Sequence, residues 1–241
     1  MKYNKINIFL PTYHRVSNGK LPRFLTSCIV NVSRMDNVCI TFLLNKNDYE
    51  TIDYLNNVRV PLESEMLFTN MSKPHLGKFY NYIYNNTRFK DAGTLVSMVG
   101  DDMEWRTAGY DKKILNAINR VNGYGLVYCN DDFVQGDKLC VNLFTTRKFV
   151  ELTGKPFMCE MFAAYYIDTV WMEVGEKTNT LIYLDDVILK HHHYTANPKR
   201  ADKTSIRLKK EMVGFKKGHS LVNKYVNTVI KNINSKGVLH A

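Results

Sequence analysis

The sequence predicts one α/β domain built on a mostly parallel central sheet that is flanked by helices. In the first half of the chain, short β-rich runs alternate with amphipathic helical patterns, and this alternation is typical of parallel strands joined by crossover helices. A length of 241 residues and a mass of 28.0 kDa suit a single domain. A hydrophobic fraction of 45% is ordinary for a globular protein.

The expected elements follow from hydrophobic periodicity, taken in chain order. β-Rich apolar runs predict strands over 6–10, 38–44, 58–68, 95–99, 126–128, 140–144, 180–184 and 187–190. Amphipathic spacing predicts helices over 22–33, 47–56, 77–87, 108–121, 146–152, 161–174 and 204–234. The second half of the chain alternates less regularly than the first.

The domain organisation follows from the helix predicted over 204–234, in a part of the chain that is strongly basic from residue 195 onward. We expect residues 1–203 to form the main domain, and residues 204–241 to form a basic helical C-terminal extension packed on it. The side chains expected to pack this extension against the core are Ile206, Met212, Phe215, Val222, Tyr225 and Ile230.

Several absences bear on the cellular compartment. No segment reaches the roughly 20 apolar residues that a membrane-spanning helix needs, and the apolar run at 6–10 is too short for a signal peptide. The five cysteines are odd in number and contain no CxxC pair, which indicates neither a disulfide framework nor a cysteine zinc site. We therefore expect a cytoplasmic protein.

The charge balance is strongly basic. A formal net charge of +10 and a pI near 9.3 favour phosphate-bearing partners, such as nucleic acid, an anionic membrane or a nucleotide. A solvated surface without a specific partner explains the same composition. The bias is strongest after residue 195, where Lys199, Arg200 and Lys203 begin a basic segment.

Polar residues follow two of the predicted strands directly. Residues 11–15 (PTYHR) come after the first strand, and Gly100, Asp101 and Asp102 come after the fourth. In an open α/β sheet ligands bind outside the carboxyl ends of the strands, so both loops face one edge. Two adjacent carboxylates repel each other, and a divalent cation removes that cost. The alternative is a turn whose aspartates cap the next helix.

Three consecutive histidines follow the last predicted strand. Strand alternation would place His191 and His193 on the same face, and two imidazoles suit Mn²⁺ or a similar ion. A solvated strand edge is the alternative. We therefore expect the metal ligands to come from Asp101, Asp102, His191 and His193.

Five segments, in this order along the chain, resemble a known family. They are residues 11–15 (PTYHR), 77–81 (GKFYN), 99–111 (VGDDMEWRTAGYD), 166–171 (YIDTVW) and 191–193 (HHH). The first resembles the nucleotide-binding opening of GT-A glycosyltransferases of the inverting, processive-synthase-like superfamily. The third and fifth are similar to the Gly-Asp-Asp form of the DxD motif and the His-x-His element of glycosyltransferases encoded by bacteriophages. The likeness covers roughly residues 6–204.

The resemblance implies a GT-A, Rossmann-like fold and a reaction. The chain would move a sugar from a nucleoside-diphosphate sugar to an acceptor hydroxyl with inversion. The expected donor is a UDP-sugar. A divalent cation, Mn²⁺ or Mg²⁺, would bridge the diphosphate. Gly100 stands where the commonest pattern has an aspartate, which leaves open whether Asp101 or Asp102 contacts the metal.

The same resemblance implies roles for single residues. Asp168 would be the general base and Glu160 the reserve, with an exposed helix carboxylate as the alternative for Asp168. Trp105 would bound the sugar site or, equally, belong to the core. The residues implied for the nucleotide and its phosphates are Pro11, Thr12, Tyr13, Arg15, Lys78, Asn81, Asp101, Lys199 and Lys203.

The acceptor is the least determined part. Phage-like motifs and a basic surface favour DNA carrying a hydroxylated base, which would place the protein in the host cytoplasm. A cell-surface glycan, a protein and a lipid-linked sugar are competing acceptors. A non-catalytic, basic nucleic-acid-binding protein is the alternative from another class. The sequence leaves the oligomeric state undecided.

Overall fold

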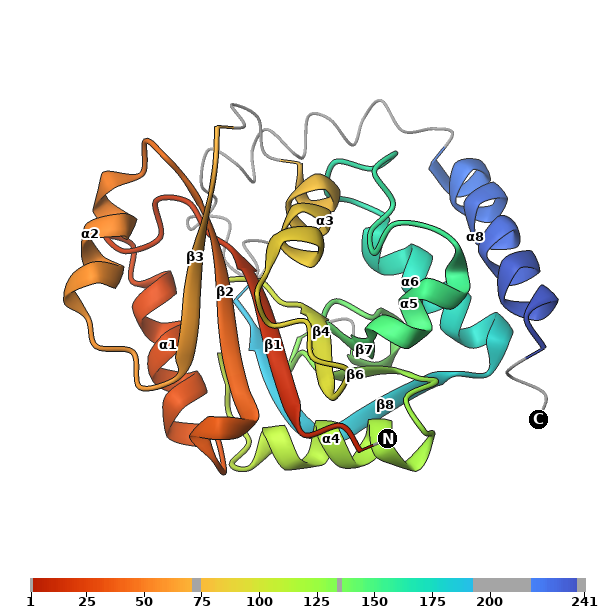
Figure 1. Ribbon diagram of the computed structural model, residues 1–241, viewed down its shortest axis with the longest axis horizontal. Coiled ribbons are helices and arrows are strands. Elements are labelled where there is room, and N and C mark those ends of the chain that lie inside the picture. The colour runs from red at the N-terminus through yellow and green to blue at the C-terminus, as the bar shows by residue number, and fades with distance from the viewer. Residues whose placement is uncertain (1, 71–74, 134–135, 193–217, 238–241) are drawn as a thin grey trace.

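The computed structural model describes residues 2–70, 75–133, 136–192 and 218–237. Its centre is an eight-stranded sheet with the strand order β3-β2-β1-β4-β7-β6-β8-β5 (Figure 1). The strands are β1 (Lys5–Pro11), β2 (Val38–Asn45), β3 (Glu63–Thr69), β4 (Thr94–Met98), β5 (Met103–Trp105), β6 (Leu126–Asn130), β7 (Leu143–Thr146) and β8 (Leu181–His191).

The sheet is mostly parallel, as predicted. Strands β3, β2, β1 and β4 are parallel neighbours, and β6 pairs in parallel with β8. Strand β7 runs antiparallel to both β4 and β6, and β5 runs antiparallel to the end of β8. The parallel half, together with its crossover helices, therefore has the doubly wound arrangement that places ligands at the carboxyl ends of the strands.

Helices cover both faces of the sheet. They are α1 (Lys20–Asn31), α2 (Tyr49–Asn57), α3 (Leu76–Asn86), α4 (Tyr110–Arg120), α5 (Arg147–Thr153), α6 (Ile167–Thr178) and α8 (Gly218–Ser235), with 3₁₀ turns η1 (Met35–Asn37) and η2 (Gly136–Lys138). Helices α1 and α4 pack on one face, and α3, α5, α6 and α8 pack on the other. The result is a three-layer sandwich (Figure 1).

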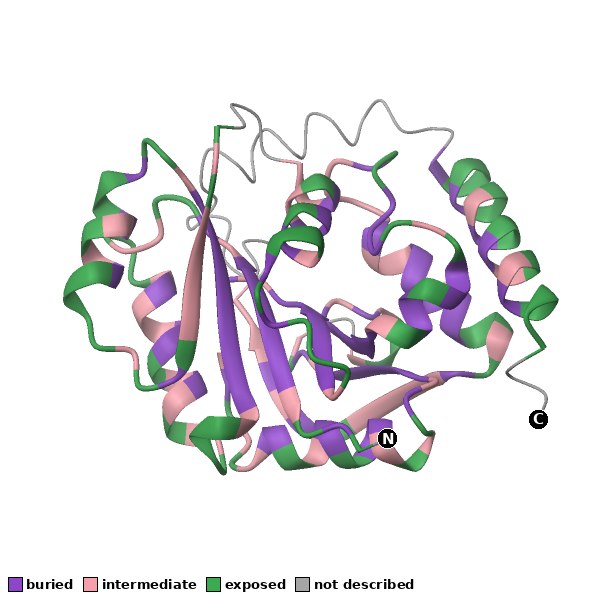
Figure 2. Ribbon diagram, viewed as in Figure 1, coloured by how far each residue is buried: buried purple, intermediate pink, exposed green. Residues whose placement is uncertain are grey.

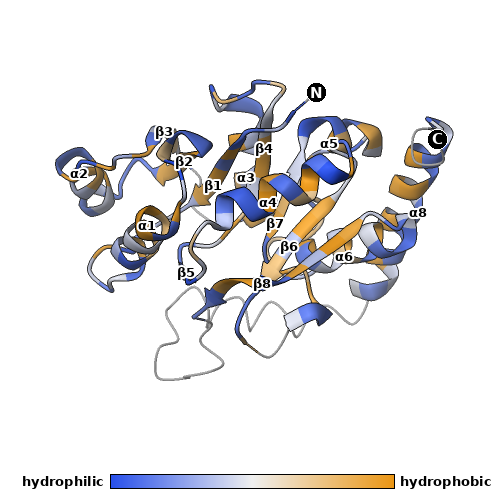
Figure 3. Ribbon diagram, turned by 90° about the horizontal axis from the view of Figure 1, so that it is seen from below, coloured by the Kyte–Doolittle hydropathy of each residue, from blue (hydrophilic) through white to orange (hydrophobic). Residues whose placement is uncertain are grey.

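The core forms because the central strands are apolar on both faces. In β1, Ile6, Ile8 and Leu10 belong to the cluster beneath α1 and α4, whereas Phe9 belongs to the opposite cluster. Continuous burial of this kind is the pattern of a strand covered on both sides. Figure 2 shows β1 and β2 buried along nearly their whole length, and Figure 3 shows apolar strands between helices with polar outer faces.

Four predicted elements differ clearly from the structure. Strand β3 starts only at Glu63, because Val58 ends α2 and Pro61 has no N–H to donate to a ladder. Helix α6 starts at Ile167 because Tyr166 has a left-handed backbone, with φ 71°. The two strands expected over 180–184 and 187–190 form one strand, β8, with a register shift opposite it in β6.

Helix α8 packs on α5 and α6 through a buried apolar face. Its side chains Val222, Val226, Val229 and Ile233 are buried against α5 and α6, while Tyr225 and Ile230 are partly buried there. The predicted helical residues 204–217, with Ile206, Met212 and Phe215, lie outside the described residues. None of the helices in the described ranges has the length and apolar character needed to cross a bilayer.

Candidate functional site

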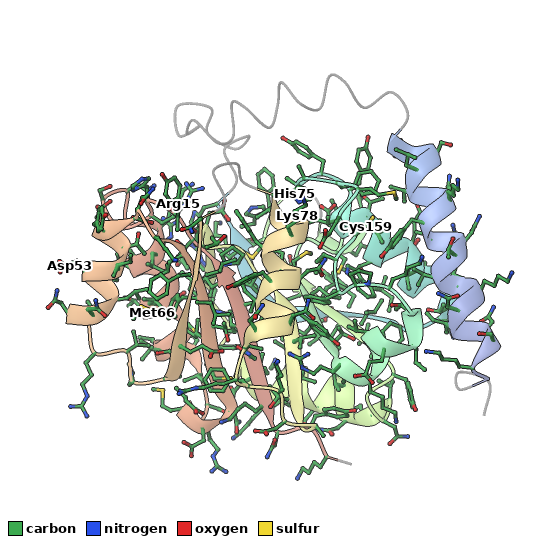
Figure 4. The ribbon with its side chains drawn as sticks, turned by 45° about the horizontal axis from the view of Figure 1, so that its top comes forward. Arg15, Asp53, Met66, His75, Lys78 and Cys159 are labelled. Carbon is green, nitrogen blue, oxygen red and sulfur yellow. The ribbon has the colours of Figure 1, made fainter. Side chains whose placement is uncertain are left out.

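The candidate site lies at the carboxyl ends of the parallel strands. The loop after β1, the turn after β4 and the start of α3 all reach this edge of the sheet. Figure 4 shows Arg15 there, together with His75 and Lys78 at the first turn of α3. The sequence therefore correctly placed the loops that carry its candidate residues on one edge.

A tight turn presents the two aspartates. Strand β4 ends at Met98, and the Met103 N–H then donates to the Gly100 carbonyl at 3.3 Å. A Cβ at position 100 would lie 2.7 Å from Asp102 Oδ1, so glycine is what allows the Asp102 side chain to fold back over the turn. Below the turn, the buried Tyr80 hydroxyl donates to the Val99 carbonyl at 2.9 Å.

Asp101 points toward a cation supplied by the β1 loop. Its side chain is 7% exposed, and its Oδ2 lies 3.4 Å from Arg15 Nε. Burial raises the pKa of Asp101 to about 6, against the lowering effect of Arg15 and with a further raising effect of Asp102. Asp101 is therefore a buried carboxylate that a single arginine does not fully compensate.

Asp102 is held against His191 by the β5–β8 ladder. Met103 pairs with His191, and the His192 N–H donates to the Asp102 carbonyl at 2.9 Å. This register brings His191 Nε2 to 3.5 Å from Asp102 Oδ1. Burial alone would raise the pKa of Asp102, but the interaction with His191 and the charges of Lys20 and Arg15 hold it below its usual range.

His191 is surrounded by acidic side chains. Burial by itself lowers the pKa of His191, but Asp102, Asp131 and Asp168 together raise it above its usual value. The side chain of His192 points to the other face, where its Nε2 lies 2.6 Å from Glu104 Oε2. Alternation thus places His191 in the site and His192 outside it. His193 lies outside the described residues.

Asp168 faces this cluster from the first turn of α6. Its Oδ1 accepts a hydrogen bond from the Thr169 N–H at 2.8 Å, and the side chain is half-buried. Burial raises the pKa of Asp168, and the His191 charge opposes that rise. The alternative of a freely exposed helix carboxylate does not fit this environment.

The β1 loop offers an open aromatic face. Tyr13 is 48% exposed and packs on the His14 ring, with the ring centroids 4.0 Å apart. Thr12, next to Pro11 at the end of β1, is buried, and its side chain helps to lower the pKa of Asp101. The His14 N–H donates to Asp48 Oδ2 at 2.8 Å, which anchors the loop to α2.

The predicted residues of α3 divide into two kinds. Lys78 is exposed, and its side chain stands at the start of the helix. The Asn81 amide donates to the Met158 carbonyl and to Glu160 Oε1, at 2.9 and 2.8 Å, and accepts from the Met158 N–H at 2.7 Å. Both amide hydrogens are used, so in this structure Asn81 positions Glu160 and its loop.

Trp105 belongs to the core and does not bound a sugar site. It is 1% exposed and stacks on Tyr110, with ring centroids 3.7 Å apart. Strand alternation directs it inward because Glu104 beside it points to the surface network. Lys199, Arg200 and Lys203 lie outside the described residues.

The sequence analysis missed two charged residues of the site. Lys20, at the start of α1, lies close enough to lower the pKa of both Asp101 and Asp102. Asp131 is the residue immediately after β6, whereas Asp101 comes three residues after the end of β4. The rule that polar residues after strands mark the site would have found Asp131, had it been applied to the second half of the chain.

The chemistry of the donor atoms fits a divalent cation. Asp102 and His191 offer oxygen and nitrogen ligands side by side, and Asp101 adds a second carboxylate in the same turn. Within the described ranges, the one group of three ligand atoms all within 4.8 Å of one another is elsewhere, at His14, Asp48 and Glu50. There Asp48 already caps α2 and anchors the β1 loop.

Known structures share this architecture, although no protein-family profile and no curated protein sequence matches the chain. TarS from S. aureus superposes with a TM-score of 0.60 at 12% identity, covering 77% of this chain and 36% of TarS. TarS 1–349 in complex with UDP-GlcNAc gives 0.60 at 11% identity, covering 78% of this chain and 59% of that one.

A third structure covers nearly the whole chain. The mannosyltransferase PcManGT from Pyrobaculum calidifontis, in complex with GDP-Man and Mn²⁺, gives a TM-score of 0.56 at 10% identity and covers 98% of this chain and 76% of that one. The chain has a GT-A-like fold. It spans about a third of full-length TarS and about three-fifths of TarS 1–349.

The Asp101→Asn variant should gain stability relative to the wild type as the pH rises from about 4 to about 7 without metal. In the folded state the pKa of Asp101 is raised to about 6. The protonated side chain therefore contributes stability to the wild type that is fully present below the unfolded pKa and is lost as the pH rises through the folded pKa. The relative gain should be on the order of 2 kcal/mol. Urea unfolding in EDTA across this range measures it.

Asp36→Asn is the matched control, since the Asp36 side chain is 90% exposed. Its stability difference from the wild type should stay nearly constant over the same range. If the stability difference for Asp101→Asn also stayed constant with pH, the pKa of Asp101 would not be raised in the folded protein.

Proposed function

We propose that the chain is a metal-dependent glycosyltransferase that moves a sugar from a nucleoside-diphosphate sugar to an acceptor hydroxyl with inversion. One observation carries this proposal: Asp102, His191 and Asp168, from three separate elements, converge at the carboxyl edge of a GT-A-like sheet. The structural neighbours solved with UDP, UDP-GlcNAc or GDP-Man and Mn²⁺ support the same class of donor.

The proposed metal ligands are Asp102 and His191, with Asp101 and the predicted ligand His193 completing the set. When bound, the cation would act as a Lewis acid that neutralises charge on the departing diphosphate. Arg15 already lies against Asp101 and would share its charge with the phosphates.

The nucleoside would lie on the β1 loop. Tyr13 offers an exposed ring on which a base can stack, and the buried Thr12 side chain is a polar group close enough to Asp101 to lower its pKa. Pro11 ends β1 directly before these two residues. Lys78 stands at the same edge as a further phosphate ligand.

Asp168 is the proposed general base. An inverting transfer needs a carboxylate that removes the proton from the acceptor hydroxyl as it attacks the anomeric carbon. Burial raises the pKa of Asp168, which makes the carboxylate a stronger base than a solvated one. Glu160, exposed and held by Asn81, is the reserve for this role.

Nucleotide sugars should raise the melting temperature of the protein only when Mn²⁺ is present, because a ligand that binds only the folded state stabilises it. At a ligand concentration about 100 times Kd, the gain is about 2.7 kcal/mol. A thermal-shift panel of UDP- and GDP-sugars, with and without Mn²⁺, measures this. No shift with any nucleotide and metal, combined with a shift on adding DNA, would favour the alternative of a non-catalytic nucleic-acid-binding protein.

Asp168→Asn should abolish sugar transfer and leave the nucleotide-dependent thermal shift unchanged. Loss of a general base typically costs about 10²- to 10⁴-fold in rate, while the amide keeps the size of the side chain. Donor turnover in the presence of acceptor gives the rate. Glu160→Gln is the matched variant. If it lost turnover while Asp168→Asn kept full activity, Glu160 would be the general base and Asp168 would not.

The finer proposal concerns the acceptor, which we propose to be a hydroxylated base in phage DNA. The net charge of +10 supports a polyanionic acceptor. Mass spectrometry of nucleosides from hydroxymethylated DNA, incubated with the protein, donor and Mn²⁺, should show a base heavier by one sugar residue. Transfer to a glycan or protein acceptor, with unmodified DNA, would overturn this choice and leave the glycosyltransferase proposal intact.

A further inference from the structure

Asp131 is a fully buried carboxylate that the proposed reaction does not yet use. It follows β6 directly, and its side chain is 0% exposed. Oδ1 accepts hydrogen bonds from the N–H groups of Phe133 and Gly136, at 3.3 and 2.9 Å. Oδ2 is buried and has no hydrogen-bond partner among the described residues. A buried carboxylate oxygen left in this state is costly unless a cation lies near it.

Asp131 lies beside His191. Its carbonyl oxygen accepts the His191 N–H at 2.9 Å, where β6 and β8 run side by side. Its charge acts on the imidazole in the same direction as the charges of Asp102 and Asp168. Asp131 therefore holds the backbone of His191 and also adds negative charge near its ring.

The formal charges of the site call for a further cation. Four aspartates gather around His191 and the β4 turn: Asp101, Asp102, Asp131 and Asp168. The positive charges of Arg15 and Lys20 act on both Asp101 and Asp102. With a neutral imidazole, these six side chains leave a formal charge of −2, which one divalent cation balances.

We propose that Asp131 is a positioning residue of the metal centre, which fixes His191 through the backbone and supplies negative charge near its imidazole. This inference rests on the proposed function, because it assumes that His191 is a metal ligand. Carboxylates that support a ligating histidine orient the ring and increase its basicity as a ligand. The hydrogen bonds from the Phe133 and Gly136 N–H groups hold the Asp131 carboxylate in place for this role.

Asp131→Asn should weaken Mn²⁺ binding by about 10- to 100-fold, the range observed when groups that support metal ligands are removed. Asparagine keeps an oxygen that accepts from Phe133 and Gly136, so the loop should survive. Titration of the full chain with Mn²⁺, followed by the electron paramagnetic resonance signal of the free ion, measures the affinity. Asp132→Asn is the control, since Asp132 contacts Lys190 and Arg106 at the surface, and it should bind within about twofold of the wild type.

A double-variant cycle tests whether Asp131 acts through His191. In the His191→Gln background, Asp131→Asn should produce little additional loss, because coupled residues are non-additive. Equal Mn²⁺ affinity in the wild type and Asp131→Asn would overturn the role of Asp131 alone. Absence of Mn²⁺ binding by the wild type would overturn the metal centre as well.

A measurement on the wild type covers the case in which Asp131→Asn does not fold. The amides of Phe133 and His191 donate to the side chain and to the carbonyl of Asp131. Adding Mn²⁺ should therefore slow hydrogen exchange in peptides that contain these two amides. Slower exchange near His191 with no change near Phe133 would contradict the proposed role.

Discussion

The pairing of β5 with the end of β8 is the interaction on which the candidate site depends. Strand β5, which runs from Met103 to Trp105, begins directly after the aspartate turn, and its ladder sets Met103 opposite His191. On its other edge β5 is held by α1, because Ser27 accepts the Trp105 N–H and Asn31 donates to the Trp105 carbonyl. A shift of one residue in this register would turn His191 away from Asp102 and bring His192 toward it.

The site concentrates negative charge in a basic protein. The chain as a whole carries a formal net charge of +10, yet aspartates gather at the carboxyl edge of the sheet. Burial raises the pKa of Asp101 and Asp168, whereas neighbouring groups lower the pKa of Asp102. Such opposed shifts within one small cluster are common where metal ions or phosphates bind. The net positive charge of the chain and the acidic site are the two features from which we argue the proposed acceptor and the proposed cation.

The loop between α5 and α6 completes the site from the opposite side. Gly77 allows it to approach α3, because a Cβ at that position would lie 2.9 Å from the Cys159 carbonyl. Asn81 then fixes Met158 and Glu160. The left-handed Tyr166 ends the loop and starts α6 with Asp168 in its first turn. Helix packing on this face therefore determines where both candidate bases lie.

The sequence by itself determined the layers, most of the elements and the edge of the sheet where the site lies, because hydrophobic periodicity and strand-end polarity are local signals. It did not predict β5, since three residues are too few to show a period. It could not choose between a core and a ligand role for Trp105. Only the tertiary structure decided both points, because the β8 residues that pair with β5 lie 84 to 88 positions further along the chain.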